Sequence, residues 1–265
     1  MGKRLPVIMY HSVPSEPGRH AISAAAFRKQ LAIILDRYQV IRLSDVPARL
    51  ERPDRGTSCA VLTFDDAYLD FLENAYPVLE ADQVPCTVFV PTGLVGGTNT
   101  WDAALGVESR RLMDGAQIRG LHEEGLVEFG SHTVDHVRMT SVDRLEMRRQ
   151  AVESKRYLED LLGAQVDCFA YPYGQLDDFS PATARVLREA GYRIAVTTHW
   201  GGRHDPAHLL SLRRMHFRET DSEGTIRAKL AGRRDWITAK EKVGYALRRA
   251  RRGVRRSADT GAALA

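Results

Sequence analysis

The chain has 265 residues, of which 43% are hydrophobic and 27% charged. This composition supplies enough apolar side chains for a sizeable core and excludes a disordered or fibrous protein. Lysine and arginine outnumber aspartate and glutamate by 38 to 34, a formal net charge of +4. A single α/β barrel commonly reaches this length, so two domains are not required.

The basic residues are concentrated near the C-terminus. Residues 240–256 contain eight lysines and arginines and one glutamate, a net charge of +7, so the rest of the chain carries −3. This distribution disfavours a nucleic-acid-binding protein, because contacts with phosphates need a basic surface on the folded domain itself. We expect a folded domain over residues 1–236 and a basic tail over residues 237–265.

The cysteines and the apolar runs limit the class of protein further. Cys59, Cys86 and Cys168 are far apart and lack CxxC spacing, so they predict core residues rather than a disulfide framework or a thiolate zinc site. The apolar run at residues 5–10 is shorter than the apolar region of a signal peptide, and no stretch approaches the roughly 20 residues of a membrane-spanning helix. The default expectation is a soluble cytoplasmic protein.

Short apolar runs bounded by turn residues recur along the chain and predict strands. They lie at residues 5–10, 39–43, 59–64, 86–90, 126–129, 168–171, 194–197 and 209–217. Longer segments between them have apolar residues at three- and four-residue spacing, which predicts amphipathic helices. This alternation favours a parallel sheet with helical crossovers, which about seven or eight strands can close into a distorted (β/α) barrel.

Two of the connecting segments have distinct features. Thr140 and Asp143 stand in the spacing of a capping box and predict a helix that ends at Gly163. This helix carries the apolar residues Leu145, Val152, Leu158 and Leu161. Residues 92–114 form the most obvious insertion, and loops of that length are often functional.

Polar residues able to do chemistry follow the C-terminal ends of several predicted strands. They are Tyr10 and His11, Asp65 and Asp66, Ser131 and His132 with His136, and Pro172 to Gly174. In a parallel barrel these ends share one face, so the pattern predicts a single site there.

Two pairs within this set suggest a metal. Asp65 and Asp66 repel each other unless a cation or a shared proton lies between them, although aspartates also stabilise helix N-termini. His132 and His136 can reach one ion from one side of a helical turn, although most isolated pairs are surface or core histidines. Two imidazoles and one carboxylate would supply three protein ligands and leave positions open, as a catalytic zinc-type site requires.

The motifs resemble those of the polysaccharide deacetylases, the NodB-homology or carbohydrate esterase family 4 domain. In chain order they are residues 9–12 (MYHS), 63–68 (TFDDAY), 131–136 (SHTVDH) and 169–174 (FAYPYG). The resemblance covers about residues 5–230 and implies that the folded domain is a catalytic barrel. It implies Asp65 as the general base and Asp66, His132 and His136 as ligands of one divalent metal ion, most often zinc.

The sequence departs from the better-known family pattern in three places. Ala170 stands where many members have an arginine that orients the base, and the Asp-rich motif ending in tryptophan and the late Leu-x-His are missing. The early Met-Tyr-His and the late Leu-x-Arg at residues 212–214 resemble the branch of exopolysaccharide deacetylases of the poly-N-acetylglucosamine type. In that branch an early histidine is a candidate acid, which points to His11, with His199, His204 and His216 as alternatives.

The resemblance implies removal of N-acetyl groups from an amino sugar in a glycan, with release of acetate. The backbone N–H of Tyr173 would stabilise the oxyanion, and an imidazolium such as His11 would protonate the departing amine. We expect substrate contacts from Tyr68, Trp101, Pro172 and Arg214. The alternatives are an amidase acting on a non-sugar C–N bond, a non-catalytic carbohydrate-binding domain, and a membrane-surface adaptor acting through the tail.

The basic tail has apolar residues at positions that suggest a short amphipathic helix. Val243, Ala246, Leu247, Ala250 and Val254 lie among the eight cations. Such a helix could lie on anionic lipid and place the protein beside lipid-linked sugars. The alternative is a solvated terminus, because Gly244 and Gly253 weaken a helix.

Overall fold

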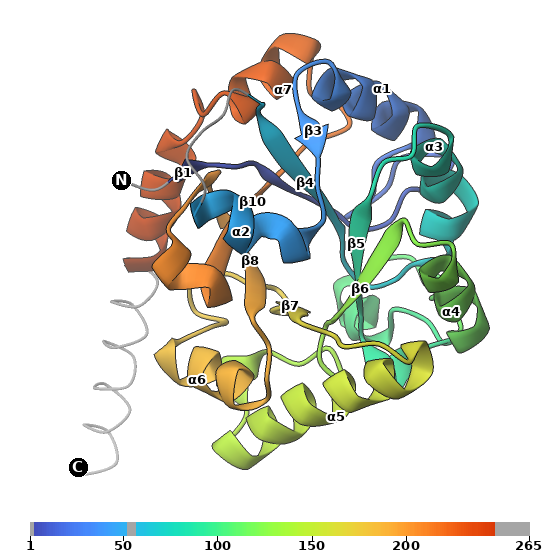
Figure 1. Ribbon diagram of the computed structural model, residues 1–265, viewed down its shortest axis with the longest axis vertical. Helices are drawn as coiled ribbons and strands as arrows, with labels where there is room; N and C mark the ends of the chain where they lie inside the picture. Colours follow the sequence, from blue (N-terminus) through green and yellow to red (C-terminus); the bar gives the residue numbers. More distant parts are fainter. Residues whose placement is uncertain (1–2, 52–56, 247–265) are drawn as a thin grey trace.

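The computed structural model describes residues 3–51 and 57–246, and its strands form a closed ring surrounded by helices (Figure 1). The ring strands are β2 (Val7–Tyr10), β4 (Cys59–Phe64), β5 (Cys86–Val90), β6 (Val127–Ser131), β7 (Cys168–Ala170), β8 (Ile194–Trp200) and β10 (Leu212–His216). They are parallel and follow the order β2-β10-β8-β7-β6-β5-β4, and β4 pairs again with β2. The expected distorted (β/α) barrel is therefore confirmed, with seven strands in the ring.

The remaining elements are not part of the ring. The helices are α1 (Ala24–Leu35), α2 (Val46–Glu51), a π-helical turn (Phe71–Ala75) that continues into α3 (Tyr76–Ala81), α4 (Gly115–Glu123), α5 (Arg144–Leu162), α6 (Pro181–Glu189) and α7 (Glu223–Leu230). The strand β3 (Gln39–Val40) pairs with β4, and β1 (Lys3–Arg4) pairs with β9 (Arg203–His204). Residues 209–211, expected in the last strand, belong to a 3-10 helix (Pro206–Ser211) that precedes β10.

The apolar residues of the ring strands alternate between two cores. Val61, Phe89 and Val196 belong to one cluster, together with residues of α2, which lies across the ring in Figure 1. Their neighbours Leu62, Val88 and Ala195 belong to a larger cluster shared with the outer helices. This period-two alternation is what a closed barrel requires, because successive side chains point inward and outward. The three cysteines are buried and free, as expected.

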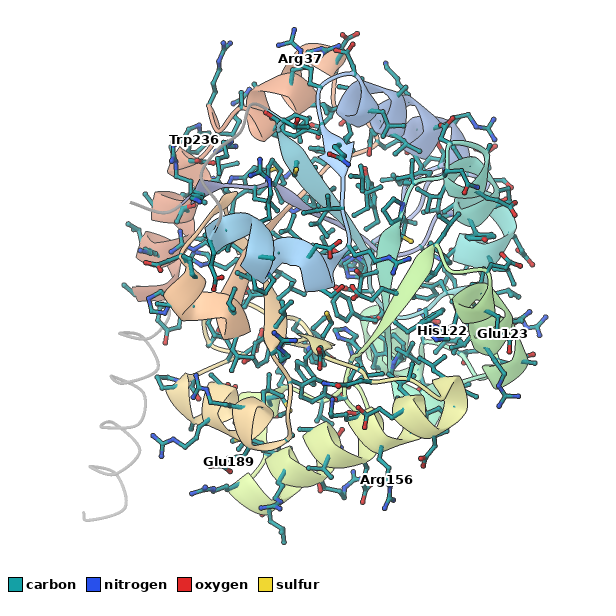
Figure 2. The ribbon with its side chains drawn as sticks, viewed as in Figure 1. Arg37, His122, Glu123, Arg156, Glu189 and Trp236 are labelled. Atoms are coloured by element: carbon teal, nitrogen blue, oxygen red, sulfur yellow. The ribbon has the colours of Figure 1, made fainter. Side chains whose placement is uncertain are left out.

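The helix expected after Thr140 forms as α5, but its cap and its buried face differ from the prediction. Asp143 is the N-cap and accepts a hydrogen bond from the backbone N–H of Glu146 (2.9 Å), whereas Gly163 ends the helix in the left-handed conformation as expected. Leu145 is 80% exposed and Val152 39% exposed. The buried side chains of α5 are Gln150, Ala151, Ser154 and Leu158, while Arg156 lies on its outer side (Figure 2). Polar contacts with the barrel, described below, decide this face.

The start of the expected tail packs on the barrel. Residues 236–246 are helical. Thr238 Oγ1 donates a hydrogen bond to the carbonyl of Trp200 (2.8 Å), and Glu241 Oε2 accepts one from the Trp200 backbone N–H (2.9 Å). Residues 247–265, which hold most of the expected lipid-binding stretch, lie outside the described residues. Within the described ranges, no helix is long and apolar enough to cross a membrane.

A tight contact in the barrel gives the first prediction. A Cβ at Gly130 on β6 would lie 2.6 Å from a ring carbon of Phe89 and 2.8 Å from the carbonyl oxygen of Cys168. Gly130→Ala should therefore lower the free energy of unfolding by about 1–3 kcal/mol, measured by urea denaturation followed by circular dichroism. Gly120→Ala is the matched control, because a Cβ there meets nothing within 4 Å and replaces a helical glycine. Equal stability of the two variants would contradict the packing argument.

Candidate active site

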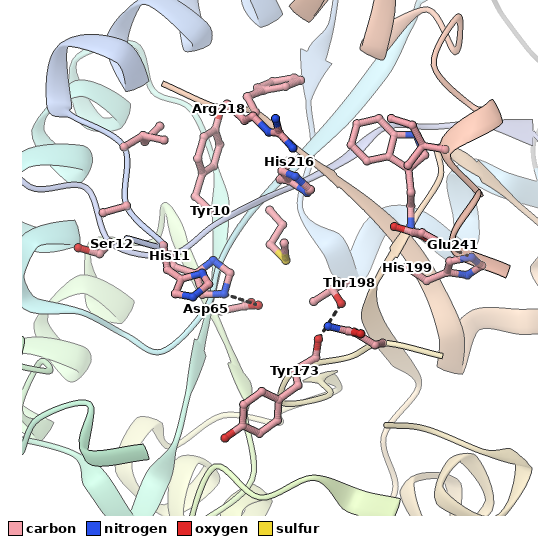
Figure 3. A pocket seen from close by; sticks show the side chains of 18 of the residues that line it. Tyr10, His11, Ser12, Asp65, Tyr173, Thr198, His199, His216, Arg218 and Glu241 are labelled. Atoms are coloured by element: carbon pink, nitrogen blue, oxygen red, sulfur yellow. Dashed lines mark hydrogen bonds and ion pairs between the residues drawn. The ribbon is translucent and has the colours of Figure 1, made fainter. Parts of the chain in front are cut away.

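The carboxyl ends of the ring strands open into one pocket with a volume of about 1330 Å³. The expected site residues His11, Asp65, Asp66, His132 and His136 all line it, together with Trp101 and Tyr173. Figure 3 shows His11 beside Asp65 on one side of the pocket and Tyr173 with Thr198 on another. The barrel thus brings together residues from the ends of β2, β4, β6 and β7, the four strand ends that the sequence pattern predicts, and adds Trp101 from the insertion after β5.

Three ligand-type atoms converge at one end of this pocket. Asp66 Oδ1 lies 3.4 Å from His132 Nε2 and 3.3 Å from His136 Nε2, and all three residues are buried. Within the described chain Asp66 Oδ1 has no hydrogen-bond partner. A tetrahedral ion with bonds of about 2.0–2.1 Å separates its ligand atoms by about 3.4 Å, so this spacing fits a zinc-type ion.

The protonation of the two imidazoles supports a cation between these atoms. His132 Nδ1 lies 2.8 Å from the carbonyl oxygen of Ala170, which places the proton on Nδ1 and leaves Nε2 with its lone pair. Burial lowers the pKa of His132 and lowers that of His136 to about 4, so both rings are neutral at neutral pH. The Nε2 lone pair of His132 then faces Asp66 Oδ1, an arrangement that a divalent ion between them would stabilise.

Backbone strain is concentrated around this site. Asp66, Ala67, Thr133, His136 and Tyr173 have positive φ angles of 75°, 55°, 68°, 52° and 62°. Non-glycine residues rarely adopt this region, and such outliers persist only where surrounding contacts fix them. The strand-end loops are therefore held in their conformations by the rest of the fold.

Gln150 of α5 holds the loop between the two histidines. Its Oε1 accepts hydrogen bonds from the backbone N–H groups of Val134 (2.8 Å) and Asp135 (3.0 Å), and its Nε2 donates one to Asp135 Oδ2 (2.6 Å). Gln150 is fully buried. The apolar periodicity of the helix gave no indication of this residue, although a glutamine where a core side chain is expected was an available signal.

Asp65 forms a buried ion pair with Arg214. The Arg214 Nη1 and Nη2 atoms donate to Asp65 Oδ1 (2.7 Å) and Oδ2 (2.6 Å), and Nε donates to the Thr197 carbonyl (2.9 Å). Burial alone would raise the pKa of Asp65, but the guanidinium outweighs it and holds that pKa well below its ordinary value. Arg214 thus takes the orienting place that Ala170 leaves vacant. Arg214 was expected to contact the substrate, but it is not among the residues that line the pocket. Its ion pair with Asp65 holds it buried behind that residue.

His11 lies next to the same carboxylate. Its Nε2 is 3.7 Å from Asp65 Oδ2, and its side chain is 26% exposed. Burial lowers the pKa of His11, and the carboxylates of Asp65 and Asp66 oppose that effect. Asp70 fastens the loop after His11 by accepting hydrogen bonds from Ser12 Oγ and from the backbone N–H of Val13.

The expected substrate contacts divide into two groups. Trp101 stacks on His136 with ring centroids 4.2 Å apart, and the Tyr173 ring lies edge-on to His136 at 5.1 Å. Tyr68 and Pro172 are not among the residues that line the pocket. Tyr68 is buried where its backbone bridges to Leu112 of the insertion, and Pro172 is buried at the turn after β7. Chain packing, rather than a substrate, surrounds these two side chains.

The Gln150 contacts give a prediction that is independent of any metal. Gln150→Met keeps the length of the side chain and removes both acceptor bonds, so the amides of Val134 and Asp135 should exchange hydrogen at least about tenfold faster. The measurement is hydrogen–deuterium exchange with residue resolution. Arg148→Met on the exposed side of α5 is the control and should leave both rates unchanged. Unchanged protection in Gln150→Met would show that other contacts hold the loop.

Known proteins resemble this chain in sequence. The family model for polysaccharide deacetylase matches residues 52–195. Bacillus subtilis YxkH is 24% identical over 200 residues, covering 75% of this chain and 66% of that protein. The poly-β-1,6-N-acetyl-D-glucosamine N-deacetylase of Staphylococcus aureus (strain MRSA252) is 26% identical over 162 residues, covering 57% and 53%. The chain therefore spans between half and two thirds of the length of these relatives.

Solved structures share most of the fold. The Streptococcus pyogenes deacetylase PplD, in complex with acetate, superposes with a TM-score of 0.73 at 24% identity, covering 87% of this chain and 99% of that one. IcaB from Ammonifex degensii gives a TM-score of 0.70 at 25% identity, covering 86% and 97%. The family model matches more than half of the length of this chain. The chain therefore belongs to the polysaccharide deacetylase family, the NodB-homology domain that its motifs indicate.

Proposed function

We propose that this chain is a metal-dependent hydrolase that removes N-acetyl groups from an amino sugar in a polysaccharide, oligosaccharide or carrier-linked glycan. The carrying observation is the convergence of Asp66, His132 and His136 beside the carboxylate of Asp65 in one pocket. The name of the Staphylococcus aureus relative states this reaction for poly-β-1,6-N-acetyl-D-glucosamine, and PplD was solved with acetate, the expected product. Both are consistent with acetamide hydrolysis.

The metal that we propose is zinc, held by Asp66, His132 and His136. Two neutral imidazoles and one carboxylate are a common ligand set of catalytic zinc, which leaves a position for substrate or water. When bound, the ion would polarise the acetamide carbonyl and lower the pKa of a water molecule. The contact of His132 Nδ1 with the Ala170 carbonyl would orient this ligand.

The other groups supply proton transfer and charge stabilisation. Asp65, ionised and oriented by Arg214, would take the proton from the attacking water. No acceptor among the described residues takes the backbone N–H of Tyr173, which is therefore available to the oxyanion. His11 would donate a proton to the departing amine. Acetate and a free amino sugar would be the products.

Measurements of metal content and turnover should distinguish the metal ligands from the proposed general base. The purified chain should hold about one divalent ion, and His132→Ala should lose it, because only two ligands remain. His122→Ala, on the outer helix α4 (Figure 2), is the matched control and should keep both metal and activity. Asp65→Asn should keep the metal and lose about 10²- to 10⁴-fold in kcat. The measurements are elemental analysis and release of acetate from N-acetylated oligosaccharides. Retention of metal and activity in His132→Ala would exclude the proposed ligand set.

The pH profile tests His11. An acid acts in its protonated form, and burial places the pKa of His11 below its ordinary value of about 6.5, so kcat/KM should fall as the pH rises through that lower pKa. His11→Ala should lower kcat, remove this alkaline limb and leave metal content unchanged. An unaltered profile in a stable variant would move the role to His199 or His216, which line the same pocket. His204, the third alternative, does not line it and lies 3.0 Å from the Leu5 carbonyl oxygen.

A further inference from the structure

The pocket extends well beyond the proposed metal ligands. Its distal half, meaning the lining residues within 198–200, 216–229 and 234–244, is formed by the end of β8, the loop and helix after β10, and the helical segment 236–246. Figure 3 shows His216 with Arg218 and His199 with Glu241 in this half. Ligand pockets commonly measure about 300–1,000 Å³, so the whole pocket has room for more than a single sugar.

The carboxylates of the distal half are all engaged. Glu219 accepts hydrogen bonds from the backbone N–H and Oγ of Ser23, both at 2.8 Å. Asp221 accepts hydrogen bonds from Lys229 Nζ and from the Arg218 backbone N–H. Glu241 accepts one from the Trp200 backbone N–H. The fold therefore fixes the positions of these three acids, and within the described ranges only Asp221 is paired with a cation, Lys229.

Three cations of the distal half have no partner in the fold. Arg218, Arg234 and Lys240 are exposed and line the pocket, and among the described residues their side chains have no hydrogen-bond or ion-pair partner. Burial lowers the pKa of Lys229, its ion pair with Asp221 opposes that effect, and the positive charges of Arg218 and Arg234 add to it. Arg218 and Arg234 therefore both lie near Lys229, and an anion among the three would be attracted by each of them.

A buried donor also remains unused in this half of the pocket. Trp200 Nε1 is buried without a hydrogen-bond partner in the described chain, and so is His199 Nε2, a ring nitrogen that donates only when it carries the proton. The Trp200 residue is 2% exposed, and Lys229 Nζ lies 5.6 Å from the centroid of its ring. Glu241 Oε2 is 3.4 Å from His199 Nε2, without the geometry of a hydrogen bond. Unpaired buried N–H groups are costly, and an acceptor in the pocket would satisfy them.

We propose that the distal half binds a phosphoryl group carried by the substrate, so that the preferred substrates are N-acetylated amino sugars linked to phosphate. A phosphoryl group has up to two negative charges and several acceptor oxygens, which suit cations supplied by three separate segments. This inference rests on the proposed deacetylase function, because it assumes that the acetamide lies at the metal end. It adds the class of substrate that the other end selects.

Direct binding tests the site without requiring turnover. The full-length chain with its metal is titrated calorimetrically at physiological salt with N-acetylglucosamine 1-phosphate, with inorganic phosphate and with neutral N-acetylglucosamine. Arg218→Gln and Arg234→Gln should each weaken binding of the sugar phosphate by about tenfold. Arg233→Gln is the matched control, because this exposed arginine is the neighbour of Arg234 and does not line the pocket. The metal site and the basic tail are identical in all variants and cancel from the comparison.

The outcomes of this titration are distinct. Loss of affinity in Arg218→Gln and Arg234→Gln, with Arg233→Gln unchanged, supports the site. Equal losses in all three variants would reveal a general charge effect and overturn it, as would no loss at all. If inorganic phosphate binds as tightly as the sugar phosphate, the site serves free phosphate, and the proposed class of substrate is wrong.

Turnover tests the substrate class separately. Acetate release should show kcat/KM at least about tenfold higher for N-acetylglucosamine 1-phosphate than for N-acetylglucosamine, and Arg234→Gln should abolish this preference, whereas Arg233→Gln should keep it. Equal kcat/KM for both substrates would overturn the proposed class. If neither they nor other N-acetylated glycans release acetate, the deacetylase proposal fails, whereas the titration still decides whether the distal half binds phosphate.

Discussion

The buried ion pair between Asp65 and Arg214 is the constraint on which the site depends. The two residues are 2% and 1% exposed, and removing such charges from water costs several kcal/mol for each ion. The cost is offset by bidentate geometry and by further bonds from Arg214 to the Thr197 carbonyl and to Thr63 Oγ1 (3.1 Å). These partners lie on β4, β8 and β10, next to the point where β2 and β4 close the ring. The contacts that orient the proposed base therefore also link strands next to the closure of the barrel.

The position of Arg214 on β10 also explains the role of Ala170. In many family members an arginine at this point of the motif orients the base, whereas here Ala170 is fully buried on β7 and Arg214 reaches Asp65 from β10. The small side chain of Ala170 packs in the smaller hydrophobic cluster, and its backbone carbonyl orients His132. The base and the metal ligands are thus oriented by different strands, so a change in one support need not displace the other.

The sequence predicts the barrel and the gathering of its motifs well, and it predicts the supports of the site poorly. Parallel strands with apolar runs determine that residues such as His11 and Asp66 meet on one face, because geometry leaves no other place for strand ends. The pairing of Asp65 with Arg214 joins residues 149 positions apart, and no local pattern encodes it. Gln150 was missed because hydrophobic periodicity assumes an apolar interface, and here the helix binds a strained loop through polar groups. Tyr68 was misplaced because an aromatic beside a motif can belong to the core.

The charge of the distal half would orient a substrate. At the metal end Arg214 neutralises Asp65, and Asp66 would bind the proposed cation. Arg218, Lys229, Arg234 and Lys240 line the distal half together with Glu219, Asp221 and Glu241, which leaves one net positive charge there. A substrate with a neutral acetamide at one end and an anionic group at the other is therefore favoured with its anionic end in the distal half, so charge selects the orientation before the fit of the sugar does.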